Sequence, residues 1–139
     1  MRFRLARQPT APREARRRIR PELEHLGYVE DVVDELLVAV GEAVTNAVLY
    51  GGGGGADGDR ITVTLRTDDA ACTIDVTSRS AGWALEPPVL PAPTAERGRG
   101  LYIIDQFTDA WEVRHDREGA TLSLKRRLPA RAAEHASRS

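Results

Sequence analysis

The chain has 139 residues, 41% of them hydrophobic, with 20 basic and 21 acidic side chains for a formal net charge of −1. This predicts one domain with a single core, and the charge gives no bulk attraction to nucleic acid or to an acidic membrane. The single cysteine, Cys72, excludes an intramolecular disulfide and a cysteine-rich metal site. No apolar signal segment or run of transmembrane length is present. We therefore expect a cytoplasmic protein that contacts neither membrane nor nucleic acid directly.

The N-terminal segment predicts a strand and then a helix. Residues 2–6 alternate basic and apolar side chains, which suits a short edge strand. From Pro12 apolar residues recur at helical spacing, and Gly27 follows as a C-cap. Pro21 lies inside this run, so we expect a kink or a break near Arg20. The helix also carries an arginine cluster, which could be an electropositive binding face, although a solvated helix face is favoured. Its members are Arg13, Arg16, Arg17, Arg18 and Arg20.

A central helix is predicted from about Glu30 to about Tyr50. Its apolar residues recur at spacings of three and four, as expected for one buried face. They are Val33, Leu36, Leu37, Val40, Val44, Ala47 and Val48. Glu42 and Asn46 lie one turn apart on a different face. Such a carboxylate can polarise a hydroxyl and such a carboxamide can coordinate a hard cation. A plain solvent-facing pair is the alternative, although apolar side chains share that side.

Five glycines, 51–55, end this helix, and no lysine follows as a P-loop would require. We interpret them as a floppy connection. Alternating residues then predict two antiparallel hairpins, one over 60–76 and the other over 110–128. Between the hairpins lies a proline-rich loop without periodicity, residues 80–99. It leads to Gly98, Arg99 and Gly100 at a helix N-terminus, where unpaired backbone N–H groups favour an anion.

This order of elements predicts an α+β two-layer sandwich, with a mixed, mainly antiparallel sheet covered by helices on one face. We expect the domain to span residues 1–128 and a polar, frayed tail to occupy residues 129–139.

Taken together, the motifs resemble one known family. Residues 42–47 (EAVTNA), the hairpin, the lid-like loop and residues 98–104 (GRGLYII) occur in the order of the GHKL (Bergerat-type) ATP-binding fold. Within it the chain is most similar to the anti-sigma-factor serine kinases, stand-alone domains that regulate sigma factors by partner switching. Residues 109–111 (DAW) and 119–121 (GAT) also resemble this branch. The resemblance covers nearly the whole chain.

The resemblance implies ATP and Mg²⁺ as cofactors. By position, Glu42 resembles the catalytic base and Asn46 the magnesium ligand. The glycine box that closes over the triphosphate would contain Gly98, Arg99, Gly100 and Leu101, and residues 80–97 would be the ATP lid. The implied partners are a sigma factor and an anti-sigma-factor antagonist, and the resemblance leaves room for a homodimer. The chain has no room for the phosphoacceptor helices of a histidine kinase proper.

One box departs from the family. Its Asp-x-Gly, whose aspartate receives the adenine amino group, is replaced by Ser78-Arg79-Ser80. A neutral hydrogen bond contributes about 1 kcal/mol and a charge-assisted one about 1.5–3 kcal/mol, a difference of about tenfold or more in affinity. Asp75 is an odd number of positions from Ser78, so it should point to the other face of the strand and not substitute.

Two functions from different classes remain open. The first is an ATP- and Mg²⁺-dependent serine/threonine kinase that phosphorylates the antagonist, with Glu42 activating the hydroxyl. The second is a module of the same fold that sequesters a sigma factor or antagonist with weak or no nucleotide binding. Glu42, Asn46 and the glycine box favour the kinase, whereas Ser78 and Ser80 favour the module. We expect the kinase.

Overall fold

The structure is a computed structural model that describes residues 1–50, 60–79, 99–115 and 119–130. Its elements are β1 (Arg2–Ala6), α1 (Ala11–His25), α2 (Glu30–Tyr50), β2 (Arg60–Thr67), β3 (Ala71–Arg79), α4 (Arg99–Phe107), β4 (Ala110–His115) and β5 (Gly119–Arg127). The predicted lid over 80–97, the glycine run, Gly98 and the end of the tail lie outside the described residues.

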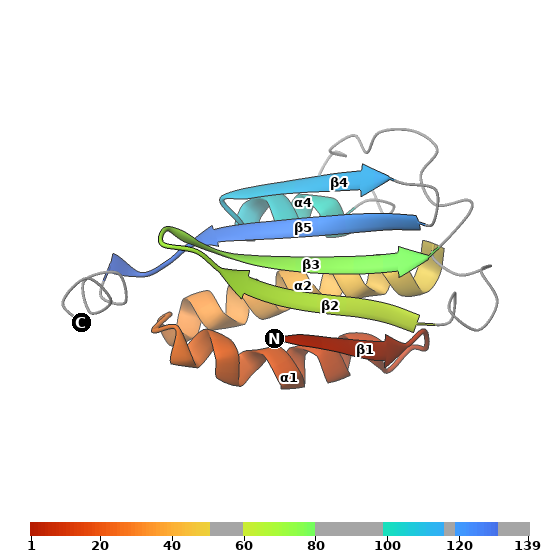
Figure 1. Cartoon of the computed structure of the whole chain (residues 1–139), viewed down its shortest axis with the longest axis horizontal. Helices are drawn as coiled ribbons and strands as arrows, with labels where there is room; N and C mark the ends of the chain where they lie inside the picture. Colours follow the sequence, from red (N-terminus) through yellow and green to blue (C-terminus); the bar gives the residue numbers. More distant parts are fainter. Residues whose placement is uncertain (51–59, 80–98, 116–118, 131–139) are drawn as a thin grey trace.

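The five strands form one sheet in the order β1-β2-β3-β5-β4, and the helices cover one of its faces (Figure 1). Helix α2 lies in the middle of the helical layer and contacts both α1 and α4. The predicted α+β sandwich is confirmed. Every strand pair in the described chain is antiparallel, rather than mixed. Between β1 and β2 the chain passes through two helices instead of a single crossover helix, so β2 returns in the opposite direction.

The covered face of the sheet forms the core with α1 and α2. Directly opposite residues on neighbouring antiparallel strands share a face, and one row across all five strands is Phe3, Val63, Val76, Leu122 and Val113. Cys72 is buried on the same face. Burial raises the pKa of its thiol from 9.0 to about 12, so it stays protonated as a core side chain.

Helix α1 continues through Pro21, so the break expected near Arg20 is absent. The proline is exposed, so its missing N–H and its ring lie on the solvent side, while Ile19 and Leu23 are fully buried and hold the helix to the core. Gly27, with φ 92°, adopts the left-handed conformation that follows a helix end. None of the described helices combines the length and apolar character needed to span a bilayer.

Candidate functional site

Helix α2 carries Glu42 and Asn46 away from the sheet. The residues on its core side, such as Val40 and Val44, are fully buried. Glu42 and Asn46 are both half-buried, so the alternative of a plain solvent-facing pair does not hold. The last turn of α2 has no basic residue. Arg7, which follows β1, compensates because its Nη1 donates a hydrogen bond of 2.9 Å to the carbonyl oxygen of Val48.

The first turn of α4 packs directly on these two side chains. A Cβ added to Gly100 would lie 2.9 Å from Glu42 Oε2 and 3.7 Å from Asn46 Oδ1. A side chain there would push the Glu42 carboxylate aside, so the glycine lets the backbone of the helix N-terminus lie against both groups without displacing them. The first N–H groups of a helix have no partner within the helix and carry the positive end of its dipole. The structure thus brings a carboxylate, an amide oxygen and an anion-binding helix end together.

Two other residues of the predicted glycine box, Arg99 and Leu101, also lie in the first turn of α4. Arg99 is the first residue of α4. The side chain of Leu101 is half-buried and packs against the core, so a ligand would meet the backbone there.

Ser78 lies near the end of β3, on the covered face opposite Ile61 and Ala120. It is only 2% exposed, and its Oγ has no hydrogen-bond partner among the described residues. A buried hydroxyl without a partner is costly, so within the described residues this oxygen is left available to a ligand or a water molecule. In Figure 1, β3 and α2 end on the same side of the molecule. Ser78 and Asn46 each lie near the C-terminal end of its element.

Asp75 points to the uncovered face of the sheet, as the alternation predicts. It accepts a hydrogen bond from Ser123 Oγ and forms an ion pair of 3.3 Å with Arg66. It therefore cannot take the place of the missing adenine-binding aspartate.

Sequence reasoning missed the role of Gly119. A side chain at this first residue of β5 would overlap the carbonyl oxygen of Ser78 and the Cα of Arg79. Gly119 therefore lets β5 close tightly on the end of β3 and shapes the backbone around Ser78. The only signal in the sequence was its place in the GAT stretch.

The described residues contain no group of three or more His, Cys, Asp or Glu side chains that could hold a metal. A Mg²⁺ ion that arrives with a nucleotide needs only one or two protein ligands, since phosphate oxygens and water complete its shell. The amide oxygen of Asn46 fits that requirement.

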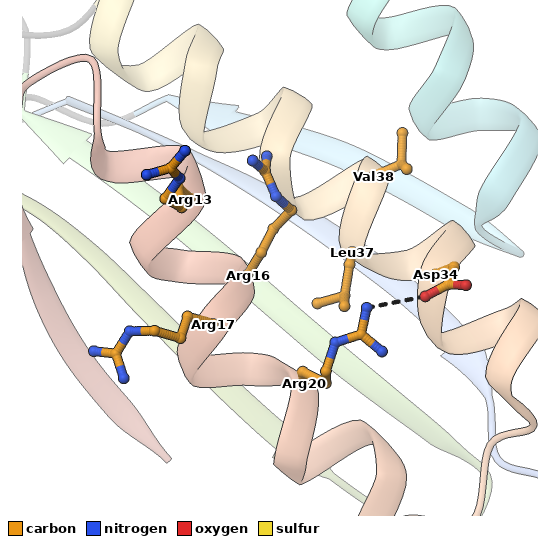
Figure 2. Close-up of a pocket in the computed structure, with 7 residues that line it drawn as sticks. All are labelled: Arg13, Arg16, Arg17, Arg20, Asp34, Leu37 and Val38. Atoms are coloured by element: carbon orange, nitrogen blue, oxygen red, sulfur yellow. Dashed lines mark hydrogen bonds and ion pairs between the residues drawn. The ribbon is translucent and has the colours of Figure 1, made fainter.

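A second feature lies between α1 and α2. A groove of about 460 Å³ is lined by Arg13, Arg16, Arg17, Arg20, Asp34, Leu37 and Val38. Figure 2 shows Arg16 extending from α1 across α2 and Arg20 reaching Asp34, with which it forms an ion pair of 3.0 Å. Arg17 is paired with Glu14. Arg13 and Arg16 have no ion-pair partner in the part of the chain that the structure describes.

Comparisons with known proteins identify the family. The family model for the histidine kinase-like ATPase domain matches residues 5–126, so the chain belongs to this family of ATPase-like domains. The resemblance stated from the sequence is confirmed.

Two similar proteins carry names that bear on function. An anti-sigma F factor of Pasteuria penetrans is 32% identical over 117 residues, which cover 79% of this chain and 73% of that protein. The serine-protein kinase RsbW of Bacillus pumilus is 30% identical over 122 residues, which cover 79% of this chain and 74% of that protein.

A solved structure shares the fold. It contains the RsbU and RsbW domains of Rv1364c from Mycobacterium tuberculosis, and it matches with a TM-score of 0.67 at 21% identity. The match covers 92% of this chain and 32% of that chain, so this chain spans about a third of the longer protein.

Proposed function

We propose that the chain is an ATP- and Mg²⁺-dependent serine/threonine-protein kinase that acts on an anti-sigma-factor antagonist and also binds a sigma factor, in a partner-switching cycle. The observation that carries the proposal is the contact of Gly100 with Glu42 and Asn46. This contact brings together Glu42 as a base, Asn46 as a metal ligand and the first turn of α4 as an anion site. The names of the relatives, an anti-sigma F factor and a serine-protein kinase, support the same assignment.

Each of these groups has a distinct role in phosphate transfer. When bound, ATP supplies the phosphoryl group and Mg²⁺ offsets the charge of the phosphates. Asn46 Oδ1 would hold the metal, and the N–H groups of the first turn of α4 would bind phosphate oxygens. Glu42 would accept the proton of the attacking serine hydroxyl. The Ser78 hydroxyl, which is buried and has no partner among the described residues, would bond the adenine.

The direct test is a transfer assay with ATP labelled at its terminal phosphate and the cognate antagonist. We expect label on a serine or threonine of the antagonist only when Mg²⁺ is present. Absence of transfer from a protein that still binds antagonist or sigma factor would reduce the chain to a binding module.

Replacing Ser78 with aspartate should tighten ATP binding. The carboxylate accepts a charge-assisted bond from the adenine amino group, worth about 1.5–3 kcal/mol against about 1 kcal/mol, so the Kd should fall about tenfold. In the protein without nucleotide, the same buried carboxylate should lower the Tm, because it has no partner.

Calorimetry and thermal unfolding measure both effects, with Ser78→Ala as the matched control. Ser78→Ala removes the unpaired hydroxyl, so its Tm without nucleotide should equal or exceed that of wild type. Its affinity for ATP should be lower. If the aspartate variant binds ATP no better than wild type, Ser78 does not contact the adenine.

We propose that a partner docks an acidic segment in the groove between α1 and α2. Arg13 and Arg16 present guanidinium groups that no described carboxylate neutralises, and Val38, which is 42% exposed, adds apolar surface to the groove. A protein segment with carboxylates and an apolar side chain matches this combination, since planar guanidinium groups bind carboxylates in a bidentate manner.

Gly41→Ala should weaken this docking without harming the kinase site. An alanine Cβ would overlap Arg16 Nη1, the far end of a flexible side chain, so the guanidinium must move while the backbone stays. Alanine is about 1 kcal/mol more favourable than glycine inside a helix, so the Tm should hold or rise. Partner affinity, measured by titration, should fall about tenfold, as for a lost charge pair of about 1–1.5 kcal/mol. ATP affinity should be unchanged, and equal partner affinity in Gly41→Ala, Arg16→Ala and wild type would exclude the groove.

A further inference from the structure

The position of α4 decides where its first turn meets Glu42 and Asn46, yet this helix is short. It has nine residues, and a helix of this length depends on tertiary contacts to form. One end is seated through Gly100, as described above. The other end is held by a separate set of contacts that belongs to neither the nucleotide site nor the arginine groove.

Arg126 on β5 holds the C-terminal end of α4. Its Nη1 donates a hydrogen bond of 2.9 Å to the carbonyl oxygen of Phe107 and lies 3.6 Å from Glu35 Oε2 on α2. The last carbonyls of a helix lack partners within the helix and carry the negative end of its dipole. The last turn of α4 has no basic residue, so β5 supplies the cation.

Arg126 is well placed to act as a fixed point. Its side chain is 25% exposed, and its own carbonyl oxygen accepts a hydrogen bond of 3.1 Å from the Tyr28 hydroxyl. A second contact supports the same end of α4, because Trp111 Nε1 on β4 donates to Asp105 Oδ1 at 2.9 Å.

The two ends of α4 meet the same face of α2. Glu35 and Glu42 are seven residues apart, close to two helical turns, so they lie on one face. Through Arg126 the helix is tied to Glu35, and through Gly100 it rests on Glu42. Helix α4 therefore runs antiparallel to α2 with an attachment at each end. The buried Ile104 and the Trp111 contact hold the body of α4, and Arg126 adds the tie between its C-terminal carbonyl and α2.

We propose that Arg126 is a positioning residue for phosphate transfer. By fixing the C-terminal end of α4 against α2, it sets where the N-terminal turn meets Glu42 and Asn46. Its kinetic consequence rests on the proposed kinase function, whereas its effect on α4 does not. Misplacing reacting groups by about 1 Å can lower a rate by about 100-fold, so a contact remote from the reaction can control it.

The test compares Arg126→Met, which keeps the apolar stem but loses charge and hydrogen bond, with Arg126→Lys, which keeps a cation. The control is Arg127→Met, because the neighbouring arginine is exposed and, among the described residues, it is held through its backbone, with its N–H donating to Asp109 Oδ2. Kinetics of transfer give kcat and KM for ATP, and hydrogen exchange of the amides of residues 103–107 reports on α4 independently of ATP. All measurements are made well below the Tm of each variant.

In Arg126→Met, we expect kcat to fall about 10- to 100-fold with a much smaller change in KM. The α4 amides should exchange about tenfold faster or more, Arg126→Lys should recover part of both losses, and Arg127→Met should match wild type. Unchanged exchange in Arg126→Met would overturn the inference. Faster exchange with unchanged kcat would also overturn it, since the contact would then be merely structural. If wild type transfers no phosphate, the proposed function fails and the kinetic role of Arg126 fails with it. The exchange result then decides only whether Arg126 fixes the end of α4.

Discussion

Glu42→Gln is expected to stop phosphate transfer while ATP still binds. Loss of a general base typically costs about 10²–10⁴-fold in rate. Glutamine keeps the size and helix propensity of glutamate and removes only the charge. Because a carboxylate near the terminal phosphate repels it, ATP should bind the variant at least as well as it binds wild type. The measurements are single-turnover transfer to the antagonist and calorimetric titration with ATP.

The matched control for this variant is Glu30→Gln, the same change in the first turn of α2. Glu30 is exposed and lies twelve residues before Glu42, so the rate should stay near that of wild type. Comparable transfer rates in Glu42→Gln and wild type would show that Glu42 is not the base.

Gly100→Ala should produce a folded protein that has lost most of its transfer activity. The added Cβ would lie 2.9 Å from Glu42 Oε2, which is the end of a flexible side chain, so the carboxylate gives way rather than the helices. Alanine also suits a helix better than glycine, and the Tm should not fall. The displaced base should slow transfer about 100-fold, the effect of a misplacement of about 1 Å.

Gly41→Ala is the counterpart of this variant, because it makes the same change in α2 and displaces Arg16 instead of Glu42. The two variants should therefore separate the functions. Gly100→Ala should lower kcat for transfer and keep partner affinity, whereas Gly41→Ala should lower partner affinity and keep kcat. If Gly100→Ala transfers phosphate at the wild-type rate, the contact of α4 with Glu42 does not contribute to catalysis.

The parts of the fold that follow a strict period could be predicted from the sequence. Helix α2 begins and ends where its apolar spacing indicated, and the place of Glu42 and Asn46 on a second face followed from the same geometry. The strand period of two placed Asp75 on the opposite face from Ser78, as the register confirms. Such features depend on neighbours in the sequence, where side-chain direction is fixed by the backbone.

Features that depend on contacts between distant segments could not be predicted. Nothing periodic indicates that Arg16 lies over Gly41, that Gly119 closes on Ser78, or that Arg126 bonds the carbonyl of Phe107. Pro21 shows the opposite failure. A local rule predicted a kink or a break there, but the helix is continuous because its other face is buried against the core.

The most direct test of the central claim, that Glu42, Asn46 and the first turn of α4 form an ATP site, is a calorimetric titration of wild type and Asn46→Ala with ATP, with and without Mg²⁺. We expect wild type to bind ATP more tightly when Mg²⁺ is present. In Asn46→Ala this gain should disappear while the Tm of the nucleotide-free protein stays nearly the same, because the side chain is only half-buried. The account would be contradicted if wild type did not bind ATP. It would also be contradicted if Mg²⁺ raised the ATP affinity of Asn46→Ala as much as it raised that of wild type.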